Sequence, residues 1–248
     1  MKYVKLFAIV FLGIVMFQSC SEDTKEGALE FNFKLLYDGN PLVAGQEYEY
    51  PLGFNFFVSK FSMFLSEISI ENSTSTFDIS DAIFLDLAAE QFDPEAATRG
   101  ASVRFENIPQ DEYTSLNISL GLPGLLNETN PSNYLSNSPL ANTGEYWAGW
   151  ESYIFHKLEG KMDPDGDGEL DTGIALHIGS DDAYRSRVIS KNIRIDGGET
   201  TLVEIELDLK DVLTIDGQPF DLKETPQVHH LGVLPKVLPI MDNLIQGF

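Results

Sequence analysis

Residues 146–179, YWAGWESYIFHKLEGKMDPDGDGELDTGIALHIG, decide the fold of this chain. Between Trp147 and Leu158 both parities carry apolar residues, which is typical of a strand buried on both faces. Between Thr172 and Gly179 apolar residues alternate with others, as in a second strand. A short acidic, glycine-rich stretch separates the two runs, so we expect a hairpin with an acidic loop.

The loop has the spacing of a cation site. Its candidate oxygen ligands are Asp163, Asp165, Asp167, Glu169 and Asp171. Crowded carboxylates repel one another unless a hard divalent ion lies between them, and Ca²⁺ prefers such ligands. Gly168 supplies a sharp turn, but Ile174 stands where an EF-hand has its bidentate glutamate, so we expect a weak site with a Kd of about 10⁻⁴ M. The alternative is a solvated acidic turn without an ion.

The rest of the chain predicts an all-β protein. Alternating runs occupy residues 28–37, 54–70, 78–87, 103–108, 113–120, 187–195 and 200–209. The run 54–70 is long enough for two strands or one bent strand. We expect 103–108 and 113–120 to form a hairpin, and a Gly197-Gly198 turn to join the last two runs. Many short strands with turns between them favour an antiparallel β-sandwich.

The two long segments outside these runs differ in character. Residues 122–144, rich in Pro, Asn, Ser and Gly, form the longest predicted loop, which leads directly into Trp147. Residues 234–248 carry apolar side chains at three- and four-residue spacing, which predicts a short C-terminal helix with Pro235 or Pro239 in its first turn. We expect this helix to close the open end of the sandwich.

The N-terminus predicts export. Lys2 and Lys5 precede an apolar run that is too short to span a bilayer, and the run ends shortly before Cys20. We expect a lipoprotein signal peptide at 1–19, a lipidated Cys20 with a polar tether at 20–27, and a single domain at 28–248. The alternative is an ordinary secretion signal with an incidental cysteine. The protein would cross the inner membrane and be lipid-anchored to the outer membrane, and the acidic tether is compatible with the cell surface.

Composition excludes several classes of function. The chain has 16 Lys and Arg against 39 Asp and Glu, a net charge of −23, so it should not bind nucleic acid through phosphates. Anionic lipid headgroups would repel it, which leaves membrane attachment to the lipid anchor. The single cysteine excludes an intrachain disulfide. No G-x-S-x-G, H-E-x-x-H, P-loop or cysteine nucleophile motif is present, so we do not expect an enzyme.

Histidines are few, and their pattern leaves their role open. Only four occur, at 156, 177, 229 and 230. His177 lies between two apolar residues and should face away from them, as a ligand or as an ordinary edge histidine. The pair His229 and His230 is a ligand site or a solvated loop. If Lys161 pairs with Thr172, His156 lies opposite His177; a one-residue slip places them on opposite faces.

Several of these motifs together are similar to a known family. The run from Trp147 to Gly160, the stretch Leu176-His-Ile-Gly179 and the C-terminal histidines resemble the MbnP-like copper-binding domain of bacterial lipoproteins. Two positions depart from the family pattern W-x-W-x-x-G-Y-x-F-x-K-x-E-G: Gly149 replaces its second Trp, and Ser152 replaces the Gly before Tyr.

This resemblance implies a site and a partner. Copper, as Cu(I), would be bound by His177 with His229 or His230, together with a tryptophan oxidised to kynurenine by a dihaem cytochrome c peroxidase-like partner. Trp147 is the first candidate for the modified residue and Trp150 the second. His156 replaces a usually apolar residue, so we expect a structural role for it.

The competing hypothesis is a surface module that binds a glycan or peptide for a nutrient-import system. The aromatic residues Tyr146, Trp147, Trp150 and Tyr153 would then form a stacking platform, with Ca²⁺ ordering the adjacent loop. The position of the rings separates the two hypotheses. A flat exposed cluster favours the glycan, whereas rings packed beside His177 favour the metal.

Overall fold

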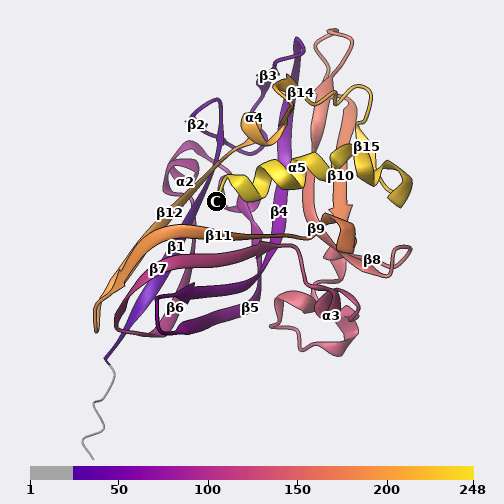
Figure 1. The fold of residues 1–248 in the computed structure, drawn as a ribbon. Coiled ribbons are helices and arrows are strands. Elements are labelled where there is room, and N and C mark those ends of the chain that lie inside the picture. The colour runs from indigo at the N-terminus through magenta and orange to yellow at the C-terminus, as the bar shows by residue number, and fades with distance from the viewer. Residues whose placement is uncertain (1–24) are drawn as a thin grey trace, which may run out of the picture.

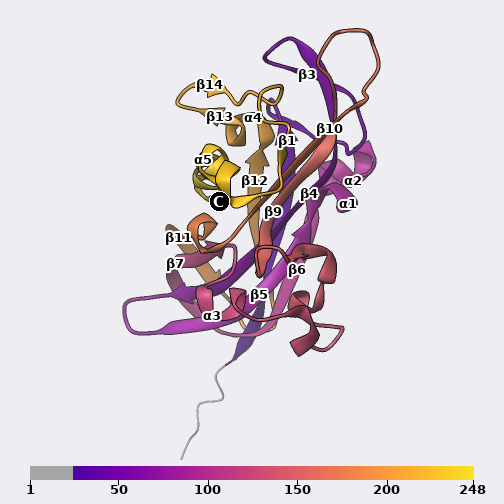
Figure 2. The ribbon, with the colours of Figure 1, turned by 90° about the vertical axis from the view of Figure 1, so that its right-hand side faces the viewer.

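Two β-sheets form the protein in the computed structural model, which describes residues 25–248. The smaller sheet has four strands: β1 (Glu26–Tyr37), β2 (Asn40–Pro41), β6 (Ala101–Pro109) and β12 (Thr200–Asp208). The larger sheet has nine: β3 (Tyr48–Tyr50), β4 (Phe54–Glu71), β5 (Thr76–Asp86), β7 (Asp111–Leu120), β8 (Tyr146–Trp147), β9 (Ser152–Asp163), β10 (Thr172–Gly179), β11 (Arg185–Ile195) and β15 (Gln227–Val228). Figures 1 and 2 show the arrangement from two sides. The predicted β-sandwich is confirmed.

Short elements fill the connections. A small ribbon consists of β13 (Thr214–Ile215) and β14 (Gln218–Pro219). The α-helices are α1 (Leu87–Glu90), α2 (Pro94–Arg99), α3 (Gly124–Asn127), α4 (Leu209–Val212) and α5 (Leu234–Gln246). The 3₁₀ helices are η1 (Pro131–Asn133), η2 (Pro139–Ala141), η3 (Thr143–Glu145), η4 (Asp181–Ala183) and η5 (Leu231–Val233). The predicted loop 122–144 thus consists mostly of single helical turns.

Strand β4 connects the parts of the larger sheet, because it pairs with four other strands. It is one strand of 18 residues, not two, and it pairs with β3 and β5 as well as with β7 and β9. Its pairing register shifts between Val58 and Lys60 and again near Glu67, which has a φ of 49°. These bulges bend the strand, so one continuous strand can serve four partners.

One predicted hairpin is wrong. Strands β6 and β7 do not form a hairpin, because β6 pairs with β1 in the smaller sheet while β7 pairs with β4 and β11 in the larger. The predicted Gly197-Gly198 turn does join β11 and β12, but these two strands belong to different sheets. Pairing is mainly antiparallel, but β1 with β12 and β10 with β15 are parallel. Alternation identifies a strand without identifying its partner.

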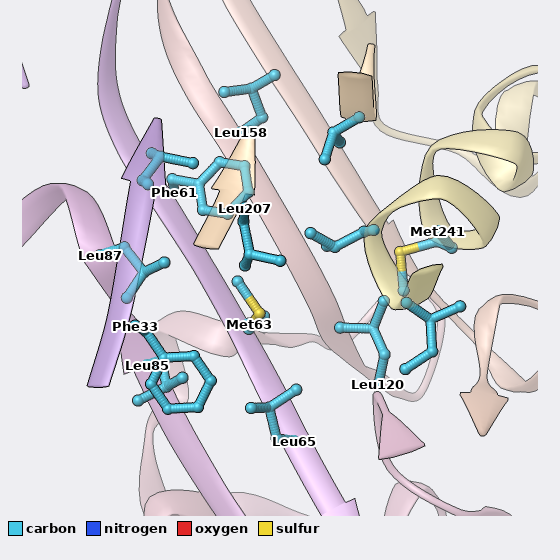
Figure 3. Close-up of a cluster of buried hydrophobic side chains, with 14 of the residues drawn as sticks. Phe33, Phe61, Met63, Leu65, Leu85, Leu87, Leu120, Leu158, Leu207 and Met241 are labelled. Carbon is cyan, nitrogen blue, oxygen red and sulfur yellow. The ribbon is translucent and has the colours of Figure 1, made fainter. Parts of the chain in front are cut away.

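The core lies between the sheets and under helix α5. Its side chains from β1, β4, β7, β9 and β12 interdigitate, as Figure 3 shows for Phe33, Phe61, Met63, Leu65, Leu120, Leu158 and Leu207. Full burial of each such side chain contributes roughly 2 kcal/mol. Because the chain has one cysteine, this packing stabilises the fold without an intrachain disulfide.

Helix α5 closes the sandwich as predicted. It buries Leu234, Val237, Ile240, Met241, Leu244 and Ile245. Pro235 sits in its first turn, whereas Pro239 lies inside the helix. The Arg187 guanidinium donates to the carbonyl oxygens of Ile245 at 3.2 Å and Phe248 at 2.9 Å, so β11 satisfies acceptors that the helix end leaves free.

The described part of the chain starts after the proposed lipidation site. Strand β1 begins at Glu26, two residues before the predicted domain start. The predicted signal peptide 1–19 and Cys20 lie outside the described residues. Among residues 25–248, no helix is both long and apolar enough to cross a membrane.

Candidate functional site

The β9–β10 hairpin carries the candidate site, and its register decides which side chains meet. Thr172 pairs with Met162, so His177 lies opposite Lys157, and His156 lies opposite Ile178. Lys157 and His177 therefore share one face, whereas His156 points into the core. This is the register in which the two histidines are separated.

Strand β8 and the turn after it place both indoles over this face. Trp147 pairs with Ser152, and the chain turns back so that the Trp150 amide donates to the Trp147 carbonyl at 3.0 Å. Glu151, with a φ of 51°, is part of this tight turn. Gly149 lies against the indole: a Cβ there would be 3.1 Å from Trp147 Nε1. The glycine that departs from the family pattern therefore allows the turn to close on Trp147.

Strand β15 supplies the second imidazole. It runs parallel to β10, with Val228 beside Leu176, which brings the next residue, His229, near His177. These residues are 52 positions apart in the chain, so only the tertiary pairing joins them. His229 is exposed, while His177 is half-buried.

Four rings make up what we call the imidazole–indole cluster: Trp147, Trp150, His177 and His229. The centroids of His177 and His229 are 5.2 Å apart. Trp147 stacks against His229 at 5.4 Å and meets His177 edge-on at 5.8 Å. Trp150 stacks on Trp147 at 5.2 Å. Trp147 is thus held between His229 and Trp150 and touches both imidazoles.

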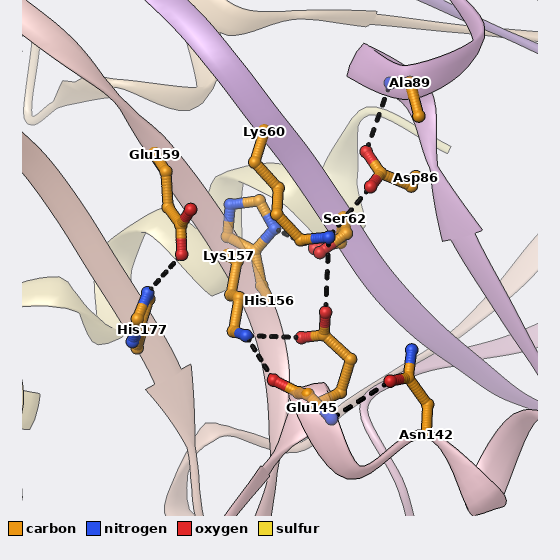
Figure 4. Close-up of polar contacts among 11 residues, drawn as sticks. Lys60, Ser62, Asp86, Ala89, Asn142, Glu145, His156, Lys157, Glu159 and His177 are labelled. Carbon is orange, nitrogen blue, oxygen red and sulfur yellow. Dashed lines mark hydrogen bonds and ion pairs between the residues drawn. The ribbon is translucent and has the colours of Figure 1, made fainter.

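His177 has one nitrogen paired and one free. Its Nε2 lies 2.7 Å from Glu159 Oε1 (Figure 4), whereas its Nδ1 is buried without a hydrogen-bond partner. Burial lowers the pKa of His177 below 6.5, the hydrogen bond with Glu159 opposes this, and the charge of Lys157 adds to the lowering. A neutral imidazole with a free ring nitrogen is the form that binds metals. Sequence reasoning missed Glu159, although its period-two spacing from Lys157 placed it on the same face.

The connection between β7 and β8, residues 121–145, which we call the covering loop, is tied to the larger sheet by an ion network beside the cluster. Glu145, only 3% exposed, lies 3.0 Å from Lys157 Nζ and 3.3 Å from Lys60 Nζ. Lys60 also reaches Asp86 at 2.8 Å (Figure 4). Because Glu145 is two residues before Trp147, this network anchors the segment that carries the indole.

His156 has the structural surroundings expected of it. It is 1% exposed, packs 4.8 Å from the Phe61 ring, and its Nδ1 lies 2.9 Å from the Ser62 carbonyl oxygen. Burial lowers its pKa to about 4. Among the residues described, its ring contact is with Phe61 and its hydrogen bond is with Ser62, and neither involves the four rings of the cluster.

The acidic loop brings three of its five candidate ligands together. Carboxylate oxygens of Asp163, Asp165 and Asp167 all lie within 4.8 Å of one another. Asp163 accepts hydrogen bonds from the amides of Gly166, Asp167 and Gly168, at 2.7, 3.2 and 2.9 Å. Burial raises the pKa of Asp163, but these amide donors outweigh it and the pKa falls below its ordinary value. Gly166 and Gly168 have φ values of 78° and 91°, the conformation that glycine tolerates best.

The remaining candidates lie apart from these groups. Glu169 and Asp171 are exposed and are not within the three-carboxylate group. His230 is exposed, precedes η5 and has its ring against Gly232. Alternation along the extended chain turns it away from the side that His229 occupies.

A groove elsewhere on the molecule lacks comparable chemistry. It measures about 620 Å³ and lies between β5, β6 and the loop 136–142. None of the described residues that line it is titratable. Chemistry therefore favours the imidazole–indole cluster as the candidate site.

Fold and site together define a β-sandwich that carries an imidazole–indole cluster on a covered sheet face. The family model MbnP matches residues 26–230, and the chain belongs to this family. The solved structure of MbnP from Methylosinus trichosporium is similar, with a TM-score of 0.50 and 15% identity over 76% of this chain and 78% of that chain. At that identity the likeness concerns the fold alone. A comparison with curated proteins gives no match.

Proposed function

We propose that this protein binds one copper ion, as Cu(I), at the imidazole–indole cluster through His177 and His229, with Trp147 beside the ion. The observation that carries the proposal is the buried, unpartnered Nδ1 of His177, which lies in a ring 5.2 Å from that of His229. A buried acceptor without a partner is costly, and a bound cation would remove that cost. Binding without an enzymatic step accounts for these features.

The donor set fits copper better than the common alternatives. Imidazole suits borderline metals, whereas Ca²⁺ and Mg²⁺ prefer oxygen. Structural zinc sites use four protein ligands, and the cluster offers two imidazoles with no thiolate. When bound, copper would supply affinity for soft donors and one-electron redox chemistry. The chain's own residues hold the two imidazole rings in contact and exclude water from Nδ1 of His177.

Metal titration tests this proposal. Under anaerobic conditions, competition with a chromogenic Cu(I) chelator should give one copper per protein for the wild type. We expect His177→Ala and His229→Ala to lose this binding. His230→Ala is the matched control and should retain it, because that ring lies outside the cluster. Equal binding by the wild type and His177→Ala would rule out the site.

Trp147 is the tryptophan that the geometry favours for oxidation to kynurenine by a dihaem cytochrome c peroxidase-like partner. It contacts both imidazole rings, whereas the ring contact of Trp150 is with Trp147. Mass spectrometry of the peptide containing residues 146–153, from protein isolated with the partner, should show a kynurenine mass change on Trp147. The change on Trp150 alone would contradict the assignment.

The acidic loop supports a second, separate role in binding Ca²⁺. Asp163 already accepts three backbone amides, which orders the loop around Asp165 and Asp167. Calorimetric titration should give a Kd of about 10⁻⁴ M. Replacement of both Asp165 and Asp167 by Ala should remove the heat. An unchanged heat in this variant would exclude the loop.

Attachment through a lipid on Cys20 completes the proposed function, with export across the inner membrane and anchoring in the outer membrane. The supporting pattern is the short apolar run that ends just before the only cysteine. Metabolic labelling with a fatty acid should mark the wild type and leave Cys20→Ser unlabelled. Equal labelling of both would contradict the anchor.

The glycan- or peptide-binding alternative has less support. A stacking platform needs an open aromatic face, but His229 and Trp150 stack against Trp147. The rings also lie beside His177, which is the arrangement that favours metal. Glycan-array binding that survives in His177→Ala but is lost in Trp147→Ala would restore this alternative.

A further inference from the structure

One side chain next to the imidazole–indole cluster has no role in the proposed function so far. Glu159 is on β9, opposite Ala175, and is the diagonal neighbour of His177 on the same sheet face. Long side chains reach across such diagonals. Its Oε1 lies 2.7 Å from His177 Nε2.

Hydrogen-bond chemistry determines which nitrogen carries the proton. An ionised carboxylate can only accept, so the hydrogen bond to Glu159 requires the proton on Nε2 of His177. The neutral ring then has its lone pair on Nδ1. That atom is buried without a partner, in a ring that adjoins those of His229 and Trp147.

The ion network keeps Glu159 available for this contact. Lys157 is the cross-strand partner of His177 and would otherwise be the natural cation for Glu159. Its ammonium is instead bound by Glu145 at 3.0 Å and by the Gly144 carbonyl at 2.5 Å. The Glu159 side chain is 35% exposed and that of His177 13%, so the carboxylate is the outer member of the pair.

We propose that Glu159 is a positioning residue that holds His177 through Nε2, so that Nδ1 is the nitrogen presented to the metal. This inference rests on the proposed copper site and goes further, because it assigns the coordinating atom and the residue that selects it. A carboxylate on the distal nitrogen also makes an imidazole a better donor.

Nuclear magnetic resonance of the copper-free protein tests directly whether Glu159 holds the His177 ring through Nε2. With only four histidines, long-range ¹H–¹⁵N correlation spectra can resolve the tautomer of each. We expect the Nε2–H tautomer for His177 in the wild type and in Glu159→Gln, whose amide oxygen also accepts. In Glu159→Ala the signal should shift toward a tautomer mixture. A wild-type His177 with its proton on Nδ1 would overturn the proposal.

Copper affinity tests the consequence. Glu159→Ala should weaken Cu(I) binding about 10- to 100-fold, while Glu159→Gln should stay within roughly 3-fold of the wild type. Glu112→Ala is the control, because it removes an exposed strand carboxylate that is far from the cluster in the sequence. It should change neither the His177 tautomer nor the Cu(I) affinity. Unchanged affinity in Glu159→Ala overturns the proposal. If the wild type binds no copper, the proposed function fails and Nδ1 of His177 is not a ligand. The tautomer spectra then still show, independently of copper, whether Glu159 holds the His177 ring through Nε2.

Discussion

Two histidines on neighbouring strands show how a shift of one residue in strand register changes the surroundings of a side chain. His156 and His177 lie on opposite faces of the β9–β10 hairpin. His156 is fully enclosed in the core, whereas His177 is a member of the imidazole–indole cluster and has one nitrogen free. Both residues are histidines, so the difference between their surroundings comes from the sheet face on which the strand register places each ring.

His156 should make stability depend on pH. Its folded pKa of about 4 lies below the ordinary 6.5, so the unfolded chain binds more protons between these values. The stability linked to this group is fully present above pH 6.5 and is lost as the pH falls to 4, by about 3 kcal/mol. Urea unfolding from pH 7 to 4 should show this loss in the wild type. A His156→Gln variant should show a loss smaller by that amount, and parallel curves would contradict the assignment.

At the residue scale, the sequence alone could locate the acidic loop and not the histidine cluster. Asp163, Asp165 and Asp167 are close because they are close in the chain, so spacing predicts their convergence. His229 reaches His177 only because β15 adds to the edge of β10, a pairing that alternation does not encode. The resemblance to a family suggested that partnership, and the residue patterns left it open.

At the scale of elements, the covering loop and the sheet depend on each other through buried charge. Glu145 is 3% exposed, and the side chain of Lys157 is 9% exposed. Removal of Glu145 leaves the Lys157 ammonium buried with only the Gly144 carbonyl as a partner, whereas removal of Lys157 leaves Glu145 paired with Lys60 at 3.3 Å. We therefore expect Glu145→Gln to lower the free energy of unfolding by about 3 kcal/mol and Lys157→Met to lower it by less. Chemical denaturation of the double variant should show a loss smaller than the sum by at least about 1 kcal/mol, whereas strict additivity would exclude coupling.

Close packing between β4 and β9 gives a second prediction for elements. A Cβ at Gly160 would lie 1.9 Å from the Phe57 carbonyl oxygen, beside the bulge in β4, so the backbone itself would have to move. Gly160→Ala should therefore destabilise the protein by about 3 kcal/mol. Gly173→Ala on the neighbouring strand is the matched control, because a Cβ there meets nothing within 4 Å. Thermal unfolding of both variants measures the difference, and similar melting temperatures would contradict it.

Which strands exist was predictable, but which sheet each one joins was not. The runs that became β6, β7, β11 and β12 were each identified near their observed bounds. The hairpin predicted for β6 and β7 does not form, because a short turn can also carry the chain from one sheet of a sandwich to the other, as the Gly197-Gly198 turn does between β11 and β12. Helix α5 was easier, because an apolar stripe at helical spacing requires one covered face.

At the scale of the whole molecule, a net charge of −23 opposes compaction, since like charges repel one another in the folded chain. Salt screens this repulsion, and the Debye length falls to about 8 Å at 0.15 M. Raising NaCl from about 0.01 to 0.15 M should therefore raise the melting temperature. This salt-dependent rise in melting temperature comes from charges over the entire surface. Any single substitution in the acidic loop should therefore leave it in place.

Calcium should also raise the melting temperature, but by binding at a single site, the acidic loop. With a Kd of about 10⁻⁴ M, 1 mM Ca²⁺ stabilises the folded state by about 1.4 kcal/mol, or roughly 4 °C in melting temperature. NaCl at matched ionic strength should give almost no shift. The Asp165→Asn/Asp167→Asn variant should lose the calcium shift and keep the response to 0.15 M NaCl, because the carboxylates of the loop bind the ion whereas the repulsion is spread over the surface. Equal calcium shifts in the wild type and the variant would mean that Ca²⁺ acts only by screening.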